Sequence, residues 1–462
     1  MSDWLTVDKS ADAAILDDYL RLRARSRELL RNDPYAVQFR RIVTNNVIGS
    51  RPVKLKSCAR TLRGKDDGAA NARIEEAWMD WQRPENCGVT GALCYHDIER
   101  MVLSAVVGDG FTFARLVRGF DNGYGFALQL WESDHLDTDF NRSRLEGRNE
   151  VRGGVELDGW GRAVAYYFFG EHPNHSGLVG NGRGLRSRMS ADDFLMVTKR
   201  DRPEQTFGAP WLAPAMVNIR HLNGYQEAAL VEARAGSAKM GFIERDEDEF
   251  GPDDEEDGTG EQLSEIEPGM VEYLKKGEKW KGWDPSNPNG NMPGFVKTVL
   301  RGVAAGVGVS YNTLANDLEG VNYSSLREQR LQDTDAWRAL QHWWIEGFEV
   351  PVHRAWFRMA SLSGALHPLP AGHSERLCRP QFIGRGWDWV DPAKEIKAMR
   401  EAVELGVDTR QDILARRSGK DLDEVVEQLK KEEEALDDAG LSEKPETAPV
   451  MVGGGGEEEG DA

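Results

Sequence analysis

The chain has 462 residues, of which 40% are hydrophobic and 29% charged, a composition that excludes a wholly disordered chain and suggests about three domains. Its 58 basic and 78 acidic residues leave a net charge of −20, and four cysteines are too few for a disulfide scaffold, which favours a reducing compartment. No segment approaches the ~18 apolar residues of a transmembrane helix, and the acidic N-terminus lacks the pattern of a secretory signal, so we expect no membrane partner.

The N-terminal half begins with helical patterns and then changes to strands. Apolar residues recur at helical spacing over 17–31, 34–48, 72–82 and 96–107, and Asp33-Pro34 is typical of a helix start, with an N-cap followed by proline. Later segments alternate or are rich in β-branched and aromatic residues, with glycine-containing turns between them. They predict a small, mostly antiparallel β region with strands at 111–118, 126–131, 151–157, 163–169 and 194–198.

The C-terminal half is predicted to be mainly helical. A long helix rich in alanine and glycine is expected over 211–239, where small side chains permit close approach of a neighbouring helix. Residues 244–294 hold many acids and turn formers, which indicates an inserted subdomain with a strand-like segment at 271–277. Asn322 is expected to cap a long helix reaching about residue 360. The remaining predictions are a short helix at 295–306, a loop at 307–321, core packing of Trp337, Trp343, Trp344 and Trp356, and helices at 393–405 and 421–435.

The negative charge is concentrated in two segments. Glu244–Asp257 contains ten acids against Arg245, and Asp421–Ala462 contains fifteen against three lysines, so the rest of the chain is close to neutral. Runs of this kind are usually solvated loops or tails, and a docking surface for a basic partner is the alternative.

Motifs for catalysis and metal binding do not occur at recognisable spacing. The nearest approach to a phosphate-binding loop is Gly419-Lys420, and the Asp421 that follows would repel phosphate. The four cysteines lack metal-ligand spacing and are expected to be structural thiols. His172 and His175 share a loop and could touch a metal, although such a pair without nearby carboxylates is more often exposed to solvent. We therefore expect no cofactor and no enzymatic activity.

Four segments resemble, in their order, the lambda-type family of tailed-phage portal proteins. They are RNDPYA at 31–36 with NVIG at 46–49, RPEQTFGAPWLAP at 202–214 before the long helix, GVGVSY at 306–311 with NYSSLR at 322–327, and FEVPV at 348–352 with Trp356. No single motif is decisive, but the ordered set runs through about residues 20–400. The acidic insertion at 244–257 and the Gly/Glu-rich tail do not belong to the family pattern.

The resemblance implies an α+β portal fold and a ring, usually of about twelve copies, at one vertex of the capsid. Such a ring conducts double-stranded DNA in packaging and ejection, nucleates procapsid assembly with the major capsid and scaffold proteins, and docks the terminase large subunit and later the head-completion or connector proteins. It does no chemistry itself. It is found in the virion and, during assembly, in the host cytoplasm.

The same resemblance divides the chain into a wing, a stem, a clip and a crown. The wing would combine residues 1–205, with helices and the β region, and residues 324–392, with the long helix. The other parts would be a stem helix at 206–240, a small α/β clip with the acidic loop at 241–294, a second stem helix at 295–306, a tunnel loop at 307–323, a helical crown at 393–440 and a disordered acidic tail at 441–462.

Three groups of residues are the expected sites. Because cations that neutralise phosphates would hold the DNA back, the channel constriction should be polar or acidic, and its candidates are Asn312, Asn316, Asp317, Glu319 and Asn322. Candidates for sequence-independent contact with the DNA backbone near the stem and clip are Lys239, Lys275, Lys276, Lys279 and Lys281. Candidates for steering a basic terminase surface are Asp246, Glu247, Asp248, Glu249, Asp253 and Asp254.

Two other classes of protein stay open at this point. A nuclease or maturation protease with scattered catalytic residues would need clustered carboxylates or a serine near a base, and neither occurs at recognisable spacing. A head–tail adaptor would usually be much shorter. The oligomeric mass and a central channel distinguish a portal from both.

Overall fold

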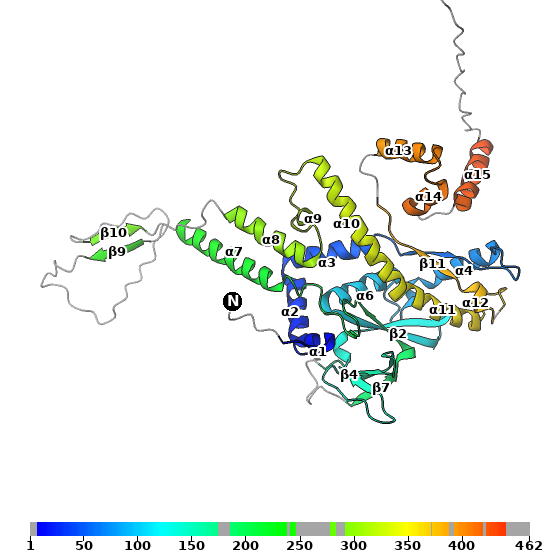
Figure 1. The fold of residues 1–462 in the computed structure, drawn as a ribbon, viewed down its shortest axis with the longest axis horizontal. Coiled ribbons are helices and arrows are strands. Elements are labelled where there is room, and N and C mark those ends of the chain that lie inside the picture. Colours follow the sequence, from blue (N-terminus) through cyan, green and yellow to red (C-terminus); the bar gives the residue numbers. More distant parts are fainter. Residues whose placement is uncertain are drawn as a thin grey trace, which may run out of the picture. The chain divides into compact units, whose positions relative to one another are not determined.

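The computed structural model describes residues 7–173, 185–237, 241–245, 278–282, 292–370, 372–387, 392–418 and 422–439 (Figure 1). The chain divides into two compact units, Met1–Arg385 and Gly386–Ala462. Within the described residues, helices combine with antiparallel strands, which confirms the expected α+β class. No helix in this part of the chain is long and apolar enough to cross a membrane.

Three helices near the N-terminus pack against one another: α2 (Tyr19–Asn32), α3 (Pro34–Val47) and α6 (Tyr95–Asp109). The predicted start of α3 is confirmed, because the Asp33 carboxylate accepts a hydrogen bond from the Ala36 N–H at 2.8 Å and Pro34 stands in the first turn. The other helices of this region are α1 (Ala11–Leu16), α4 (Gly68–Trp81) and α5 (Pro84–Cys87).

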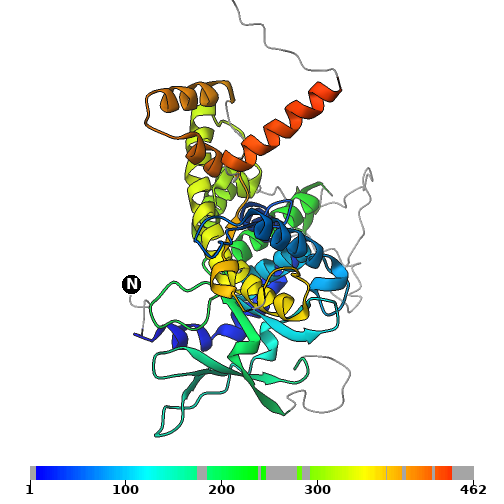
Figure 2. The same cartoon turned by 90° about the vertical axis from the view of Figure 1, so that its right-hand side faces the viewer.

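Two antiparallel sheets follow α6 and share an aromatic core (cyan to green in Figure 2). The strand orders are β3-β2-β8 and β4-β5-β6-β7. Phe113 of β2 meets Phe168 of β6 edge to face, with ring centroids 4.9 Å apart. The strands are β2 (Phe111–Phe120), β3 (Gly125–Trp131), β4 (Glu150–Arg152), β5 (Val155–Leu157), β6 (Ala163–Phe169), β7 (Arg186–Ser190) and β8 (Phe194–Thr198), with 3-10 turns at Ser133–His135 and Ala191–Asp193.

The β region differs from the prediction at two places. Residues 151–157 form two strands instead of one, because Gly153 and Gly154 both adopt positive φ and turn the chain. Strand β7 has no counterpart among the predicted strands, since its polar and mostly exposed residues carry no apolar alternation.

A two-stranded sheet joins distant parts of the first unit. β1 (Lys54–Ser57) pairs antiparallel with β11 (Pro380–Ile383), and both strands are too short for their sequence pattern to predict them. Beside this sheet, the Trp78 ring of α4 packs against Trp356 and Phe382, with centroids 4.9 and 6.2 Å away. The pairing therefore brings segments that are far apart in the sequence onto one aromatic cluster.

One helical run carries the predicted tryptophans. It consists of α10 (Tyr323–Trp344), a π-helical segment (Ile345–Glu349) and α11 (Val350–Ser363), and α12 (Ser374–Leu377) follows. Core packing is confirmed for Trp337, Trp344 and Trp356. Trp343 is only half-buried, and its indole N–H donates to the Thr198 carbonyl at 3.3 Å.

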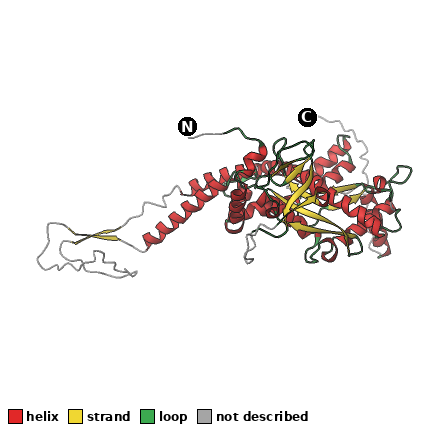
Figure 3. Ribbon diagram, turned by 90° about the horizontal axis from the view of Figure 1, so that it is seen from below, coloured by secondary structure: helices red, strands yellow, loops and turns green. Residues whose placement is uncertain are grey.

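Helices α7 (Met216–Ser237) and α8 (Met292–Val307) pack side by side (Figure 1; Figure 3 shows the same ribbon from below). The Tyr225 and Phe295 rings join them, with centroids 4.8 Å apart. α7 begins at Met216 instead of Trp211, because Pro214 disfavours helical geometry at the residue before it. In the sequence between these two helices, β9 (Gly241–Arg245) and β10 (Glu278–Gly282) pair antiparallel. The predicted strand-like segment 271–277 lies outside the described residues.

The second unit contains three helices in its described part: α13 (Pro392–Glu404), α14 (Arg410–Ser418) and α15 (Leu422–Asp438). The predicted helices at 393–405 and 421–435 correspond to α13 and α15. α14 has no predicted counterpart, because its short and strongly charged sequence gives little apolar periodicity.

Candidate functional site

The region proposed as the channel constriction contains a short helix. α9 (Tyr311–Ala315) interrupts residues 307–321, which corrects the expectation of a loop throughout. Leu314 is buried, and α9 contacts α3 and α8. The hydrophobic anchor explains why a segment rich in glycine and asparagine nevertheless forms helix here.

Two of the predicted constriction residues meet at Lys297 of α8. Its Nζ lies 2.7 Å from Glu319 Oε2 and 3.4 Å from Asp317 Oδ2. The Tyr311 hydroxyl donates to Asp317 Oδ2 at 2.7 Å, and this hydrogen bond is the main reason that the pKa of Asp317 is lowered. The acidic charge of this segment is therefore partly balanced by a lysine that lies outside the predicted set.

The three predicted asparagines have different structural roles. The Asn312 amide donates to Gln329 Oε1 of α10 at 3.0 Å, and Asn322 Oδ1 caps α10 by accepting from the Ser325 N–H at 2.8 Å. Asn316 is exposed and adopts the left-handed conformation, with φ of 52°, that ends α9. Asn312 and Asn322 thus hold the segment on α10, and Asn316 provides the turn toward the acids.

The other two predicted groups lie mostly outside the described residues. Lys279 and Lys281 lie on β10, opposite Glu244 and Phe242 of β9. The residues outside the described part are Lys239, Lys275, Lys276, Asp246, Glu247, Asp248, Glu249, Asp253 and Asp254, together with His175. Their assigned roles stay predictions.

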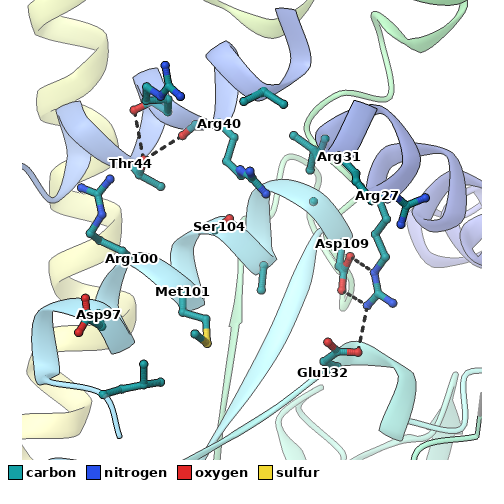
Figure 4. A pocket seen from close by; sticks show the side chains of 16 residues that line it. Arg27, Arg31, Arg40, Thr44, Asp97, Arg100, Met101, Ser104, Asp109 and Glu132 are labelled. Atoms are coloured by element: carbon teal, nitrogen blue, oxygen red, sulfur yellow. Dashed lines mark hydrogen bonds and ion pairs between the residues drawn. The ribbon is translucent and has the colours of Figure 1, made fainter. Parts of the chain in front are cut away.

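A groove lined by arginines lies between α2, α3 and α6 (Figure 4). Its volume is about 950 Å³, and we call it the arginine groove after Arg27, Arg31, Arg40, Arg41 and Arg100. α2 contributes the first two of these residues, α3 the next two, and α6 the last. The predicted site residues do not include them, because only the packing of three helices brings these side chains together.

At one end of the groove, Arg27 belongs to a buried ion-pair network. Its guanidinium binds Asp109 at 2.8 and 2.5 Å and Asp134 Oδ2 at 2.6 Å. Arg23 Nη2 lies 2.7 Å from Asp134 Oδ1, and both of these side chains are buried. Burial alone would raise the pKa of Asp134, but the positive charges of Arg23 and Arg27 outweigh it and lower the pKa.

The same network corrects the interpretation of His172 as a loop side chain without nearby carboxylates. His172 Nε2 lies 3.1 Å from Glu132 Oε2 and 3.8 Å from Asp134 Oδ1. These three groups have the donor types of a metal site. Because Arg23 and Arg27 already balance Asp134, the arrangement favours an ion-pair network over a cation site.

All four cysteines, Cys58, Cys87, Cys94 and Cys378, are free thiols. Cys87 is buried, and burial raises its pKa to about 12, which keeps it in the unreactive thiol form. This agrees with the expected structural role.

Residues 1–341 match the family model described as phage portal protein, lambda family. The chain belongs to the lambda family of phage portal proteins. It is 34% identical over 423 residues to the "Probable portal protein" of Halomonas phage phiHAP-1, covering 91% of this chain and 81% of that protein. Identity to portal protein B of Escherichia phage lambda is 22%, with 96% and 88% covered.

Among solved structures, a chain from the neck of an empty gene transfer agent particle is 15% identical. The match covers 86% of this chain and 92% of that chain, with a TM-score of 0.44.

Membership in the portal family confirms the resemblance carried by the four sequence segments. It decides against a hydrolase or a short adaptor as the identity of the chain, because portal proteins are structural components of phage particles. The family match includes the arginine groove, α7, α8, α9 and most of α10, and the relatives extend the similarity beyond it.

Proposed function

We propose that this portal protein forms a closed ring of about twelve copies at the unique vertex of the capsid and conducts double-stranded DNA in packaging and ejection. The similarity to a portal protein over 91% of the chain carries the proposal. The ring would nucleate procapsid assembly with major capsid and scaffold proteins, then dock the terminase large subunit and the head-completion or connector proteins. It acts without catalysis, first in the host cytoplasm and then in the virion.

The parts of the portal are assigned as follows. The wing comprises residues 1–205 and 324–392, the stem α7 and α8, and the clip residues 241–294. Residues 307–323, with α9, form the tunnel loop, and residues 393–440 form the crown. The acids within 244–257 are proposed to steer a basic surface of terminase toward the clip.

Exposed apolar side chains on α7 support a contact between copies. Val217, Leu230 and Val231 are 61%, 52% and 58% exposed. Val217 and Val231 lie about four helical turns apart and therefore on the same side of the helix. Because each copy in a ring presents two different faces to its neighbours, an apolar face left open on one copy fits against the next.

Ring formation is tested by particle mass and negative-stain imaging. We expect a particle with a central hole and about twelve times the 51.7 kDa of one chain. The double variant V217D/V231D should give folded monomers or small oligomers, because the contact would bury two unpaired carboxylates. The control L362D, at a 71% exposed position of α11, should still form rings. A wild-type chain that stays monomeric at high concentration and with scaffold protein would contradict the proposal.

The tunnel-loop assignment is tested by adding cations to it. The double variant N316K/E319K should package DNA several-fold more slowly, and higher salt should reduce the defect, because added lysines neutralise phosphates and release counterions. The control N316Q/E319Q removes the glutamate charge without adding a cation. Equal packaging rates for intact rings of both variants would show that the loop does not face the DNA.

A further inference from the structure

We propose that the arginine groove is a docking site for an acidic, amphipathic segment of a partner protein other than this chain. The proposal does not depend on ring formation or on the path of the DNA. It follows from three properties of the groove: its unbalanced positive charge, the engagement of its own carboxylates, and its apolar lining.

Four of the five arginines carry charge that no acid neutralises in the described part of the chain. Arg31, Arg40, Arg41 and Arg100 take part in no ion pair with a carboxylate among these residues. Arg100 is nevertheless held in place, because it donates to the Gly49 carbonyl at 2.9 Å and to Asn45 Oδ1 at 3.0 Å. Both acceptors are neutral, so the guanidinium of Arg100 is positioned while its charge stays available.

The carboxylates that line the groove are engaged with other groups. Asp109 binds Arg27 at 2.5 and 2.8 Å, and Glu132 lies 3.1 Å from His172 Nε2. Asp97 accepts from the Cys94 N–H at 3.4 Å at the start of α6, where the helix dipole favours a negative charge. Because the five lining arginines outnumber the three lining carboxylates, the groove concentrates positive potential in a concave surface.

The apolar lining distinguishes between two kinds of acidic partner. Val37, Leu93, Met101 and Ala105 line the groove, and Met101 is 47% exposed. In Figure 4, Met101 lies on α6 near Arg100, and Arg40 approaches from α3. A DNA backbone would neutralise the arginines but would leave these apolar groups against a charged polymer. A protein segment with acids on one face and apolar residues on the other would pair with the arginines and also cover the apolar lining, as in helix-in-groove recognition.

The test measures binding of a labelled peptide to the full-length chain by fluorescence anisotropy. The probe is a short helical peptide with glutamates on one face and leucines on the other. We expect R40Q/R41Q to weaken binding by at least about tenfold, because hydrogen bonds between charged groups are lost. The matched control R21Q/R25Q changes two exposed arginines of α2 that do not line the groove, and it should alter binding by less than about twofold.

The apolar contribution has its own variants. The M101Q variant, and a probe with serines in place of its leucines, should each weaken binding several-fold. Circular dichroism checks that every variant is folded. If an arginine variant is unfolded, M101Q still tests whether the peptide binds in the groove.

Three outcomes would overturn the proposal. The first is equal loss of binding in R40Q/R41Q and R21Q/R25Q, which would mean general attraction to a basic surface. The second is tighter binding of a DNA duplex than of the peptide, with the same dependence on Arg40 and Arg41, which would make the groove a nucleic-acid surface. The third is that the wild-type chain does not bind the peptide and that R40Q/R41Q forms smaller oligomers than the wild type. This result would assign the groove to a contact between copies.

Discussion

Replacement of Asp134 by alanine is expected to lower the free energy of unfolding by about 3–5 kcal/mol, as is typical when one partner of a buried ion pair is removed. The Asp134 side chain is 1% exposed and lies 2.7 Å from Arg23 and 2.6 Å from Arg27. Without it, Arg27 keeps Asp109, but Arg23 loses its carboxylate partner and keeps only neutral ones in the described residues, the Ser133 hydroxyl at 3.2 Å and the Tyr19 ring. Chemical unfolding followed by tryptophan fluorescence measures the loss.

The pH dependence and an exposed pair provide controls for this prediction. The folded-state pKa of Asp134 is lowered, so its contribution is fully present above the ordinary value of 3.8 and is lost as the pH falls below it. The difference in the free energy of unfolding between wild type and D134A should therefore become smaller at acidic pH. D335A removes an exposed partner of Arg338, 3.2 Å away, and should cost no more than about 0.5 kcal/mol. Equal losses in D134A and D335A would show that the buried network does not stabilise the unit.

Stability is also expected to fall as the pH rises from about 5 to about 8. Glu99 and Glu349 are fully buried. Burial raises the pKa of Glu99 from 4.5 to about 8, and burial together with the nearby Glu99 charge holds the pKa of Glu349 well above its usual value. In this window the folded chain binds protons that the unfolded chain releases. Each group can then contribute up to about 1.4 kcal/mol per pH unit, or several kcal/mol in total.

Variants of Glu349 separate the effect of its protonation on stability from the effect of the hydrogen bonds that it accepts. Its carboxyl oxygens accept from the Tyr95 hydroxyl and the Trp344 indole N–H, each at 2.8 Å. Glu349→Gln stays neutral at every pH and should make the decline in stability shallower, leaving the part contributed by Glu99, whereas Glu349→Ala leaves two buried donors unpaired and should cost several kcal/mol at every pH. Glu346→Gln changes an exposed glutamate of the same π-helical segment and serves as the control. Unfolding by denaturant at pH 5, 7 and 9 measures the profiles, and a flat wild-type profile would contradict the prediction.

The sequence predicts features that depend on neighbouring residues. Asp33-Pro34 marks the start of α3 because capping is local, and the apolar periodicity of the tryptophans predicts most of the buried face of α10 and α11. Glu99 and Glu349 are different, because each looks like an ordinary helix residue in sequence. Their environment arises only when α6 and the π-helical segment pack together.

In the candidate site, too, local composition can be predicted from the sequence, whereas contacts made by packing cannot. The polar and acidic character of residues 307–323 can be predicted from their composition. Its pairing with Lys297 could not be predicted, since that lysine lies on the preceding helix and approaches Asp317 and Glu319 only through packing. The arginine groove requires three helices, so spacing along the chain gives no signal for it.

The pairing of β1 with β11 has a consequence for synthesis on the ribosome. Residues 54–57 emerge long before residues 380–383, so the nascent chain carries an unpaired strand edge, and Trp78 lacks Phe382, until translation has passed residue 383. A product that terminates before residue 380 cannot close this unit. Synthesis through residue 383 is therefore a condition for this strand pairing and for the complete aromatic cluster around Trp78.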